Sequence, residues 1–477
     1  MNRIFLRSSL LLMVGLAGIY ACSRSSDPGE SVQLPGMAPA VTPKAVCGAG
    51  SQPETGLQGR VTQAEHDSGR AASGYTCNTE LVGSYVTPNA IGTVGGFKVE
   101  RYVDAAGHDC AYYDTTLLYP SNIFDSQSGV NVMDMSDPTN PVRVTELQTP
   151  AMLSPHESLV LSKERGILAA VLGNPGAYPG SVDVYDISVD CRHPVLKATA
   201  PVGILGHESG MAPDGLTFYS ASPGTPTLTA IDLTNPALPT PISVAQIYSH
   251  GLSISADGNR AYVAAVGTMG TTGSDANKGL TILDISEVQQ RKLGAQMKVI
   301  SHIAWDTISI PQNAIPVSIA GHPYLVEIDE FGAQSKVGAG RIIDIGDEVH
   351  PKVISDMRLE VHQPENFATE ANDPGANNPV GGYAGHYCNV PSRVDPGIVA
   401  CSMILSGLRI FDIHDPYHPH EVAYYNAPIN PRILTVPAPA SNWAMSSPSF
   451  VPERKEIWYT DGYSGFYAVR VTNGAWR

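Results

Sequence analysis

Short segments of alternating polar and apolar residues recur along the chain, and each segment ends at an aspartate. The six segments are residues 130–134, 182–186, 228–232, 280–284, 341–344 and 408–412. Alternation with a period of two predicts a β-strand. The aspartate can accept backbone N–H groups in the turn that follows, and a nearby proline often ends the ladder by fixing φ. The pattern therefore predicts a strand and a turn, repeated six times.

A second hairpin precedes most of these segments. In residues 251–264 it is built around the turn sequence Ala-Asp-Gly-Asn, and a further strand follows the aspartate turn, as at 142–147. Four strands in each unit of roughly 50 residues are typical of a propeller blade. The composition agrees, because 46 Gly and 38 Pro with only 16% charged residues favour frequent turns over long helices.

The number of blades follows from the repeat. Six aspartate units predict six blades, and residues 450–451, 456–460 and 465–471 supply three strands of a seventh. Residues 79–85 resemble the outer strand at 144–147, so we expect them to complete the last blade and remove an open sheet edge. The sequence thus predicts an all-β, seven-bladed propeller of four-stranded antiparallel blades over 77–477, closed by an N-terminal strand.

The repeat resembles that of the LVIVD-repeat family of bacterial β-propellers. The resemblance covers about residues 78 to 472, and it is most specific at 134–141 and 412–419, where Asp-Pro and a second Pro follow the aspartate. What it implies is the fold, since propellers serve many unrelated functions.

The N-terminus has the pattern of an export signal. Arg3 and Arg7 precede an apolar stretch at 10–18, and Ile-Tyr-Ala-Cys at 19–22 resembles a bacterial lipobox. We expect residues 1–21 to be a lipoprotein signal peptide and Cys22 to carry the lipid. An ordinary secretory signal and a retained anchor are the alternatives. Ser23 favours the outer membrane, by resemblance to bacterial lipoproteins, and the alternative location is secreted or periplasmic.

Residues 22–76 are rich in Ser, Gly, Pro and Ala and show little periodicity, so the sequence predicts a flexible tether. The formal net charge is −16, which argues against a nucleic-acid partner. The expected partners are the membrane, reached through the lipid anchor, and a protein, peptide or glycan ligand.

Six cysteines follow Cys22, and in an exported chain they are expected to form disulfides. Cys388 and Cys401 flank one turn, and we predict that they are bonded to each other. The pairing of the other four stays open; they are Cys47, Cys77, Cys110 and Cys191.

Histidines are the strongest chemical signal in the chain, because the usual hydrolase and nucleotide-binding motifs are missing. Four of them fall near the start of the first strand of blades two, three, four and six, namely His156, His207, His250 and His386. First strands line the channel of a propeller, so the four imidazoles are predicted to meet at one channel mouth. Neutral imidazole suits Zn, Cu, Fe and Ni. The alternative is that these histidines only bind water or a neighbouring blade.

Other residues near these positions have weaker assignments. Blade five offers Gln312 or Asn313 at the equivalent place, and blade seven offers Ser446 or Ser447. Glu157 and Glu208 directly follow histidines, and successive side chains on a strand point opposite ways, so we expect both to brace neighbouring blades. His362 and Glu365 are secondary candidates for a lid.

Two functions are consistent with these patterns. The first is a membrane-tethered surface or periplasmic binding module. The alternative is a propeller that binds a transition metal such as Cu, Zn or Fe through the histidine cluster, with oxidoreductase activity as one use of the ion. The arrangement is similar to that of the selenium-binding protein and methanethiol oxidase propellers in architecture and in its blade-start histidines. The characteristic cysteine motifs of that family are not apparent, so its reaction does not transfer.

Overall fold

The computed structural model describes residues 41–88, 93–115, 129–173, 179–267, 277–330, 337–377, 381–429 and 441–477. All of them belong to the compact unit Leu34–Arg477. The predicted signal peptide (1–21), the lipidation site Cys22 and tether residues 22–40 lie outside the described residues, so these assignments stay predictions.

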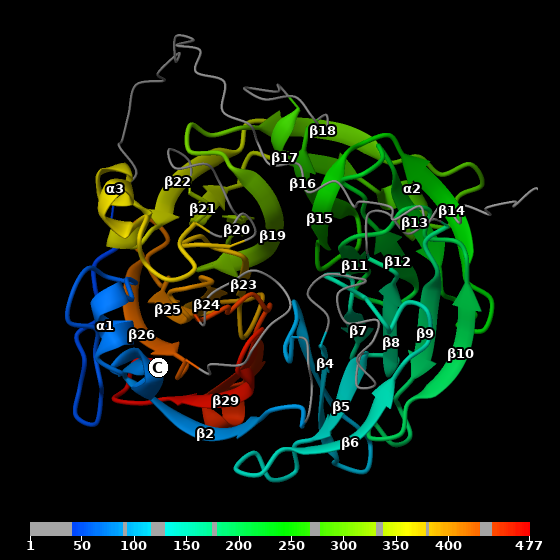
Figure 1. Ribbon diagram of the computed structural model, residues 1–477. Coiled ribbons are helices and arrows are strands. Elements are labelled where there is room, and N and C mark those ends of the chain that lie inside the picture. Colours follow the sequence, from blue (N-terminus) through cyan, green and yellow to red (C-terminus); the bar gives the residue numbers. More distant parts are fainter. Residues whose placement is uncertain are drawn as a thin grey trace, which may run out of the picture. The chain divides into compact units, whose positions relative to one another are not determined.

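Seven antiparallel sheets are arranged in a ring, as predicted (Figure 1). Blade one consists of β3 (Val99–Val103), β4 (Asp109–Asp114), β5 (Val130–Asp134) and β6 (Val142–Leu147). Blade two consists of β7 (Val160–Ser162), β8 (Ile167–Val171), β9 (Val182–Asp186) and β10 (Val195–Ala200). Blade three consists of β11 (Ser209–Met211), β12 (Thr217–Ser220), β13 (Leu228–Asp232) and β14 (Thr240–Ala245).

The remaining blades follow the same order. Blade four consists of β15 (Ser249–Ile254), β16 (Arg260–Val266), β17 (Lys278–Asp284) and β18 (Lys298–Ile303). Blade five consists of β19 (Ile310–Ile319), β20 (His322–Glu330), β21 (Gly340–Asp344) and β22 (Lys352–Met357). Blade six contains β23 (Tyr387–Asn389), β24 (Ile398–Ser402), β25 (Leu408–Asp412) and β26 (His420–Asn426). Blade seven contains β27 (Ser449–Val451), β28 (Glu456–Asp461) and β29 (Gly465–Val471).

Blade seven is completed by the N-terminal strand β2 (Thr79–Tyr85), as predicted. β2 pairs with β29 in antiparallel register from Thr79 opposite Val471 to Tyr85 opposite Phe466. The two ends of the propeller are therefore hydrogen-bonded to each other, which removes the open edge of an incomplete ring.

The repeated aspartates end the third strand of blades one to six, where the sequence places them. In each turn, Oδ1 of the aspartate accepts the N–H of the second residue after it, at 2.8 to 3.0 Å. Apolar side chains of adjacent sheets pack between the blades, as where Ile410 of blade six and Ile457 of blade seven share one core. The aspartates of the repeat thus form the turns, and its apolar residues fill the spaces between adjacent sheets.

Helices are few and short in the part of the chain that the structure describes. The α-helices are α1 (Gln63–Asp67), α2 (Ser286–Gln289) and α3 (Phe367–Glu370), and the 3-10 helices are η1 (Ala71–Ser73), η2 (Glu360–His362), η3 (Pro364–Asn366) and η4 (Pro452–Arg454). None of the described helices has the length and apolar character needed to cross a membrane.

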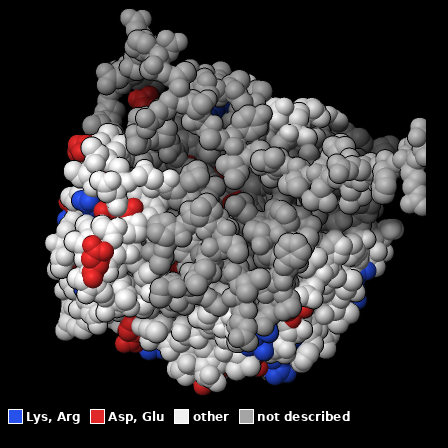
Figure 2. Space-filling view, viewed as in Figure 1, with Lys and Arg blue, Asp and Glu red and all other residues white. Residues whose placement is uncertain are grey.

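The prediction of a flexible tether over 22–76 is wrong for residues 41–76. Residues 41–77, here called the N-terminal segment, pack against blade six instead. β1 (Tyr75–Cys77) pairs with β26 as a fifth strand of that sheet, and a disulfide joins Cys47 to Cys77. Figure 2 shows several Asp and Glu side chains on the side of the molecule where Figure 1 places α1 and α3.

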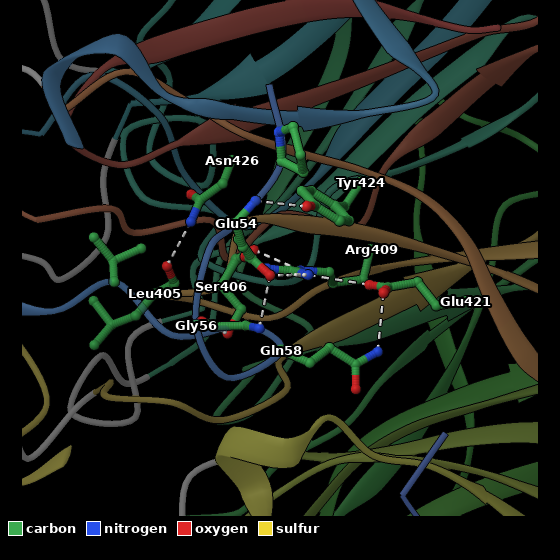
Figure 3. A network of polar contacts seen from close by, with 12 residues as sticks. Glu54, Gly56, Gln58, Leu405, Ser406, Arg409, Glu421, Tyr424 and Asn426 are labelled. Carbon is green, nitrogen blue, oxygen red and sulfur yellow. Dashed lines mark hydrogen bonds and ion pairs between the residues drawn. The ribbon is translucent and has the colours of Figure 1, made fainter. Parts of the chain in front are cut away.

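A buried ion network holds the N-terminal segment in place (Figure 3). The Arg409 guanidinium, which has no exposed surface, pairs with Glu54 of the segment and with Glu421 of blade six, the latter at 3.1 Å. The Gln58 amide donates to the other oxygen of Glu421 at 2.9 Å. These four residues are called the Arg409 network below. Polar pairs, a disulfide and a small apolar cluster that includes Val61, Tyr75 and Tyr424 hold this segment. None of them produces a periodic apolar pattern that the sequence could reveal.

The disulfides agree with the prediction where one was made. Cys388 and Cys401 lie directly opposite each other on β23 and β24 and are bonded. The pairings left open are Cys47 with Cys77 and Cys110 with Cys191, and the latter joins blade one to the turn after β9 in blade two.

Candidate metal centre

The four blade-start histidines come together at the inner ends of their blades. His156 and His207 lie just before β7 and β11, His250 is the second residue of β15, and His386 directly precedes β23. All four are buried. The ring centroids of His156 and His207 lie 4.3 Å apart, and those of His207 and His250 lie 4.5 Å apart.

Two carboxylates complete this group, and neither was expected there. Glu157 Oε2 lies 3.3 Å from His207 Nε2 and 3.4 Å from His250 Nδ1, while its Oε1 lies 3.3 Å from His386 Nε2. Glu330 Oε1 lies 2.9 Å from His250 Nε2, and Oε2 lies 3.2 Å from His386 Nε2. The six residues are called the channel cluster below: His156, His207, His250, His386, Glu157 and Glu330.

The prediction that Glu157 points away from the histidines is wrong. It assumed the alternation of an extended strand, but β7 begins only at Val160. His156 has φ of +53°, in the left-handed region. A left-handed residue breaks the two-residue alternation of a strand, and so Glu157 and His156 both reach the cluster.

Glu330 was missed because it lies at the end of the second strand of its blade, outside the blade-start register. The signal that points to it is a run of acidic residues in an otherwise apolar strand. Glu327, Asp329 and Glu330 of β20 are all buried. Buried carboxylates are costly unless they are paired or bind a metal, so such a run marks a polar site.

Backbone carbonyls set the tautomers of two of the imidazoles. His207 Nδ1 lies 3.2 Å from the carbonyl oxygen of Gly173, and His386 Nδ1 lies 2.6 Å from that of Met445. A carbonyl only accepts, so each Nδ1 carries the proton and each neutral ring presents the Nε2 lone pair to the cluster. Metal-binding histidines are oriented in this way by their outer partners.

Several cluster atoms lie at ligand spacing without forming hydrogen bonds. Among the described residues, neither Glu157 Oε2 nor His250 Nδ1 has a hydrogen-bond partner, although both are buried. His207 Nε2 and His250 Nε2, by contrast, are hydrogen-bonded to each other at 3.1 Å. Buried polar atoms without partners are rare in native proteins, and an ion is one of the standard explanations. The donor set therefore fits a bound metal.

Glu208 forms a second layer beside the cluster and joins three blades, in line with the bracing role predicted for it. Its Oε1 pairs with Lys98, just before blade one, at 3.1 Å, and accepts from Asn313 of blade five. Its Oε2 lies 3.6 Å from His250 Nδ1. The main chains of Glu157 and Glu208 also form a parallel bridge between blades two and three. Glu208 thus contacts His250 and links it to Lys98 and Asn313 of other blades.

The charges of the cluster depend on one another. Burial and the neighbouring His207 lower the pKa of His156 to about 3. Burial also opposes protonation of His386, but its hydrogen bonds to the carboxylates of Glu157 and Glu330 raise its pKa to about 9. Burial would raise the pKa of Glu157, yet the imidazoles, His250 first, hold it well below its usual range. Burial likewise opposes a low pKa at Glu330, and His250 lowers it. Both carboxylates are thus ionised and require positive charge nearby.

The remaining candidates lie elsewhere. His362 is buried in η2, where its Nδ1 accepts the N–H of Leu359 at 3.2 Å, and Glu365 is exposed in η3. Neither belongs to the channel cluster, and the lid assignment stays a prediction. In blade seven, Ser446 is buried and hydrogen-bonded to Thr460 and Ser402.

No protein-family model matches the chain, and no curated protein is similar to it in sequence. Similar solved structures include hydrazine synthase from Kuenenia stuttgartiensis, with 14% identity, TM-score 0.46, and coverage of 81% of this chain and 99% of that one. The β-propeller domain of Cps50 (Swd1) from Myceliophteria thermophila has 12% identity, TM-score 0.47, and coverage of 80% and 98%. The periplasmic gluconolactonase of Pseudomonas aeruginosa has 12% identity, TM-score 0.42, and coverage of 80% and 95%. None exceeds 14% identity or a TM-score of 0.47, so their activities carry no information about this site.

Proposed function

We propose that this chain is an exported, lipid-anchored propeller of the LVIVD-repeat type that binds a transition metal in its channel cluster. The observation that carries the proposal is the convergence of four buried imidazoles and two buried carboxylates from five different blades. Carbonyl partners leave the Nε2 atoms of His207 and His386 facing the cluster. In two groups of three of these residues, the possible ligand atoms lie within 4.8 Å of one another.

The ligand types indicate which ions fit. The cluster offers only imidazole nitrogen and carboxylate oxygen, and the six cysteines that follow Cys22 are bonded to one another in pairs. Soft thiolate ligands are therefore absent from the described part of the chain, and imidazole with carboxylate suits Zn, Fe, Cu(II) or Ni. Iron or copper in this site would fit the oxidoreductase alternative.

The metal proposal is tested on protein purified without a histidine tag. We expect inductively coupled plasma mass spectrometry to find a transition metal, and a variant with all four histidines changed to Ala to lose it. His418→Ala is the matched control, because its side chain is 83% exposed in a turn and pairs only with Asp415. Protein that stays metal-free after incubation with Zn, Fe, Cu and Ni would leave the interaction module, with a protein, peptide or glycan ligand, as the function.

The anchor is tested separately, because it does not depend on the metal. If Cys22 carries the lipid, Cys22→Ser should leave an unprocessed or soluble form that no longer partitions with detergent. Unchanged partitioning of Cys22→Ser would contradict the lipoprotein assignment, and it would leave the channel cluster unaffected.

A further inference from the structure

We propose that the channel cluster holds two metal ions bridged by Glu157, an inference that rests on the proposed function and specifies its site. Two ligand sets with mutually close atoms occur here among the described residues. One is His156, Glu157 and His207, and the other is Glu157, His250 and Glu330; in each set the ligand atoms lie within 4.8 Å of one another. Glu157 is the member that the two sets share.

His386 belongs with the second set. Its Nε2 lies 3.2 Å from Glu330 Oε2 and 3.3 Å from Glu157 Oε1. Atoms that share a tetrahedral ion at about 2.1 Å lie about 3.4 Å apart. With His386, the second set offers four ligand residues to one ion, which are His250, His386, Glu157 and Glu330. His250 lies near Glu157 through Nδ1 and near Glu330 through Nε2, and one of these two nitrogens would bind the ion.

The first set consists of His156, Glu157 and His207, and it shares only Glu157 with the second set. His156 Nε2 lies 3.7 Å from Glu157 Oε1, and His207 Nε2 lies 3.3 Å from Glu157 Oε2. These distances again have the spacing of ligands to one ion, and both histidines are buried. A single tetrahedral ion with the four ligands of the second set would not include His156 or His207.

Glu157 can bridge two metal ions because both of its carboxylate oxygens face histidines of the cluster. Oε1 faces a histidine of each set, His156 and His386, and Oε2 likewise faces one of each, His207 and His250. Bridged ions in two-metal protein sites lie about 3.5 to 4 Å apart, which a carboxylate can span.

The charges indicate what else the centre would bind. Two divalent ions bring four positive charges, and the cluster offers two carboxylates, because Glu208 is already paired with Lys98. The excess positive charge calls for an anionic oxygen ligand, either hydroxide from solvent or the oxyanion of a substrate. The centre is thus suited to a ligand with a negatively charged oxygen.

The experiment counts bound Zn²⁺ on the untagged full chain after removal of free metal. The native protein should hold two ions per chain. His250→Ala with His386→Ala should keep one, in the first set, and His156→Ala with His207→Ala should keep one, in the second. His418→Ala should keep two. Where an Ala pair does not give the native circular dichroism spectrum and elution volume, the corresponding Gln pair replaces it.

The outcomes separate the two proposals. One ion in the native protein would overturn the two-metal centre and leave metal binding standing, and no ion would overturn both. Loading with Cu²⁺ tests the bridge, because coupled spins should lower the electron paramagnetic resonance intensity per bound ion when the second equivalent binds. Two copper ions with undiminished intensity would overturn the bridging role of Glu157.

Discussion

The channel cluster and the Arg409 network both bury several charged groups, yet they are built differently. In the Arg409 network a permanent cation lies between two carboxylates, and Gln58 satisfies a further oxygen. In the channel cluster, the ion pairs of Glu157 and Glu330 within the described residues are with imidazoles alone. The nearest buried lysine, Lys98, is paired with Glu208.

The difference separates a structural site from a binding site. A guanidinium is always protonated, so the Arg409 network is complete without any ligand. An imidazole is a cation only when it takes up a proton, and in its neutral form it is a metal ligand. The channel cluster can therefore take its positive charge from protons on its imidazoles or from a bound metal ion, whereas the Arg409 network contains a permanent cation.

Substitution of Arg409 should cause the largest loss of stability. Arg409→Ala leaves Glu54 and Glu421 buried without their cation, and removal of one partner of such a pair costs about 3 to 5 kcal/mol. We expect that loss in the free energy of unfolding measured with urea. Lys298→Ala is the matched control, because its pair with Glu287 is exposed, and such pairs are worth about 0 to 1 kcal/mol.

A combined variant shows whether the loss at Arg409 comes from unpaired charge. Arg409→Met with Glu54→Gln and Glu421→Gln removes the cation and both carboxylates, so it should recover much of the lost stability. If Arg409→Ala unfolds with the same free energy as the native protein, the network does not hold the N-terminal segment.

The disulfide of the N-terminal segment has the next largest expected effect. Cys47→Ser with Cys77→Ser opens a loop with a sequence separation of 30 residues and should cost about 2 to 4 kcal/mol. Because the Arg409 network remains, we expect β1 to stay paired with β26, with protection of the Tyr75 amide, opposite Asn426, from hydrogen exchange as the readout. Complete loss of that protection would show that the disulfide alone fixes the segment.

The channel cluster should respond to metal, whereas the Arg409 network should not. At a free zinc concentration of about 100 times Kd, binding should raise the free energy of unfolding by about 2.7 kcal/mol for each ion bound. The variant that lacks all four cluster histidines should show no increase, and Arg409→Ala should show the same increase as the native protein. An equal response in the four-histidine variant would place the zinc elsewhere.

The sequence could predict the features that lie at repeat positions, and it could not predict those that lie outside them. The seven blades, the closing strand 79–85 and the four histidines follow from a repeat, since equivalent positions of successive blades meet at the same end of the ring. Glu157 was misplaced because His156 is left-handed, and Glu330 was missed because no repeat position marks it. The N-terminal segment was taken for a tether because side-chain ion pairs leave no periodic pattern.

Anomalous diffraction from crystals of the untagged, metal-loaded protein tests the central claim most directly. The account predicts anomalous density in the channel cluster, about 2.0 to 2.1 Å from Nε2 of His207 and of His386, with Glu157 between two peaks. Crystals with a stoichiometric amount of metal and no anomalous density in the channel cluster would contradict it.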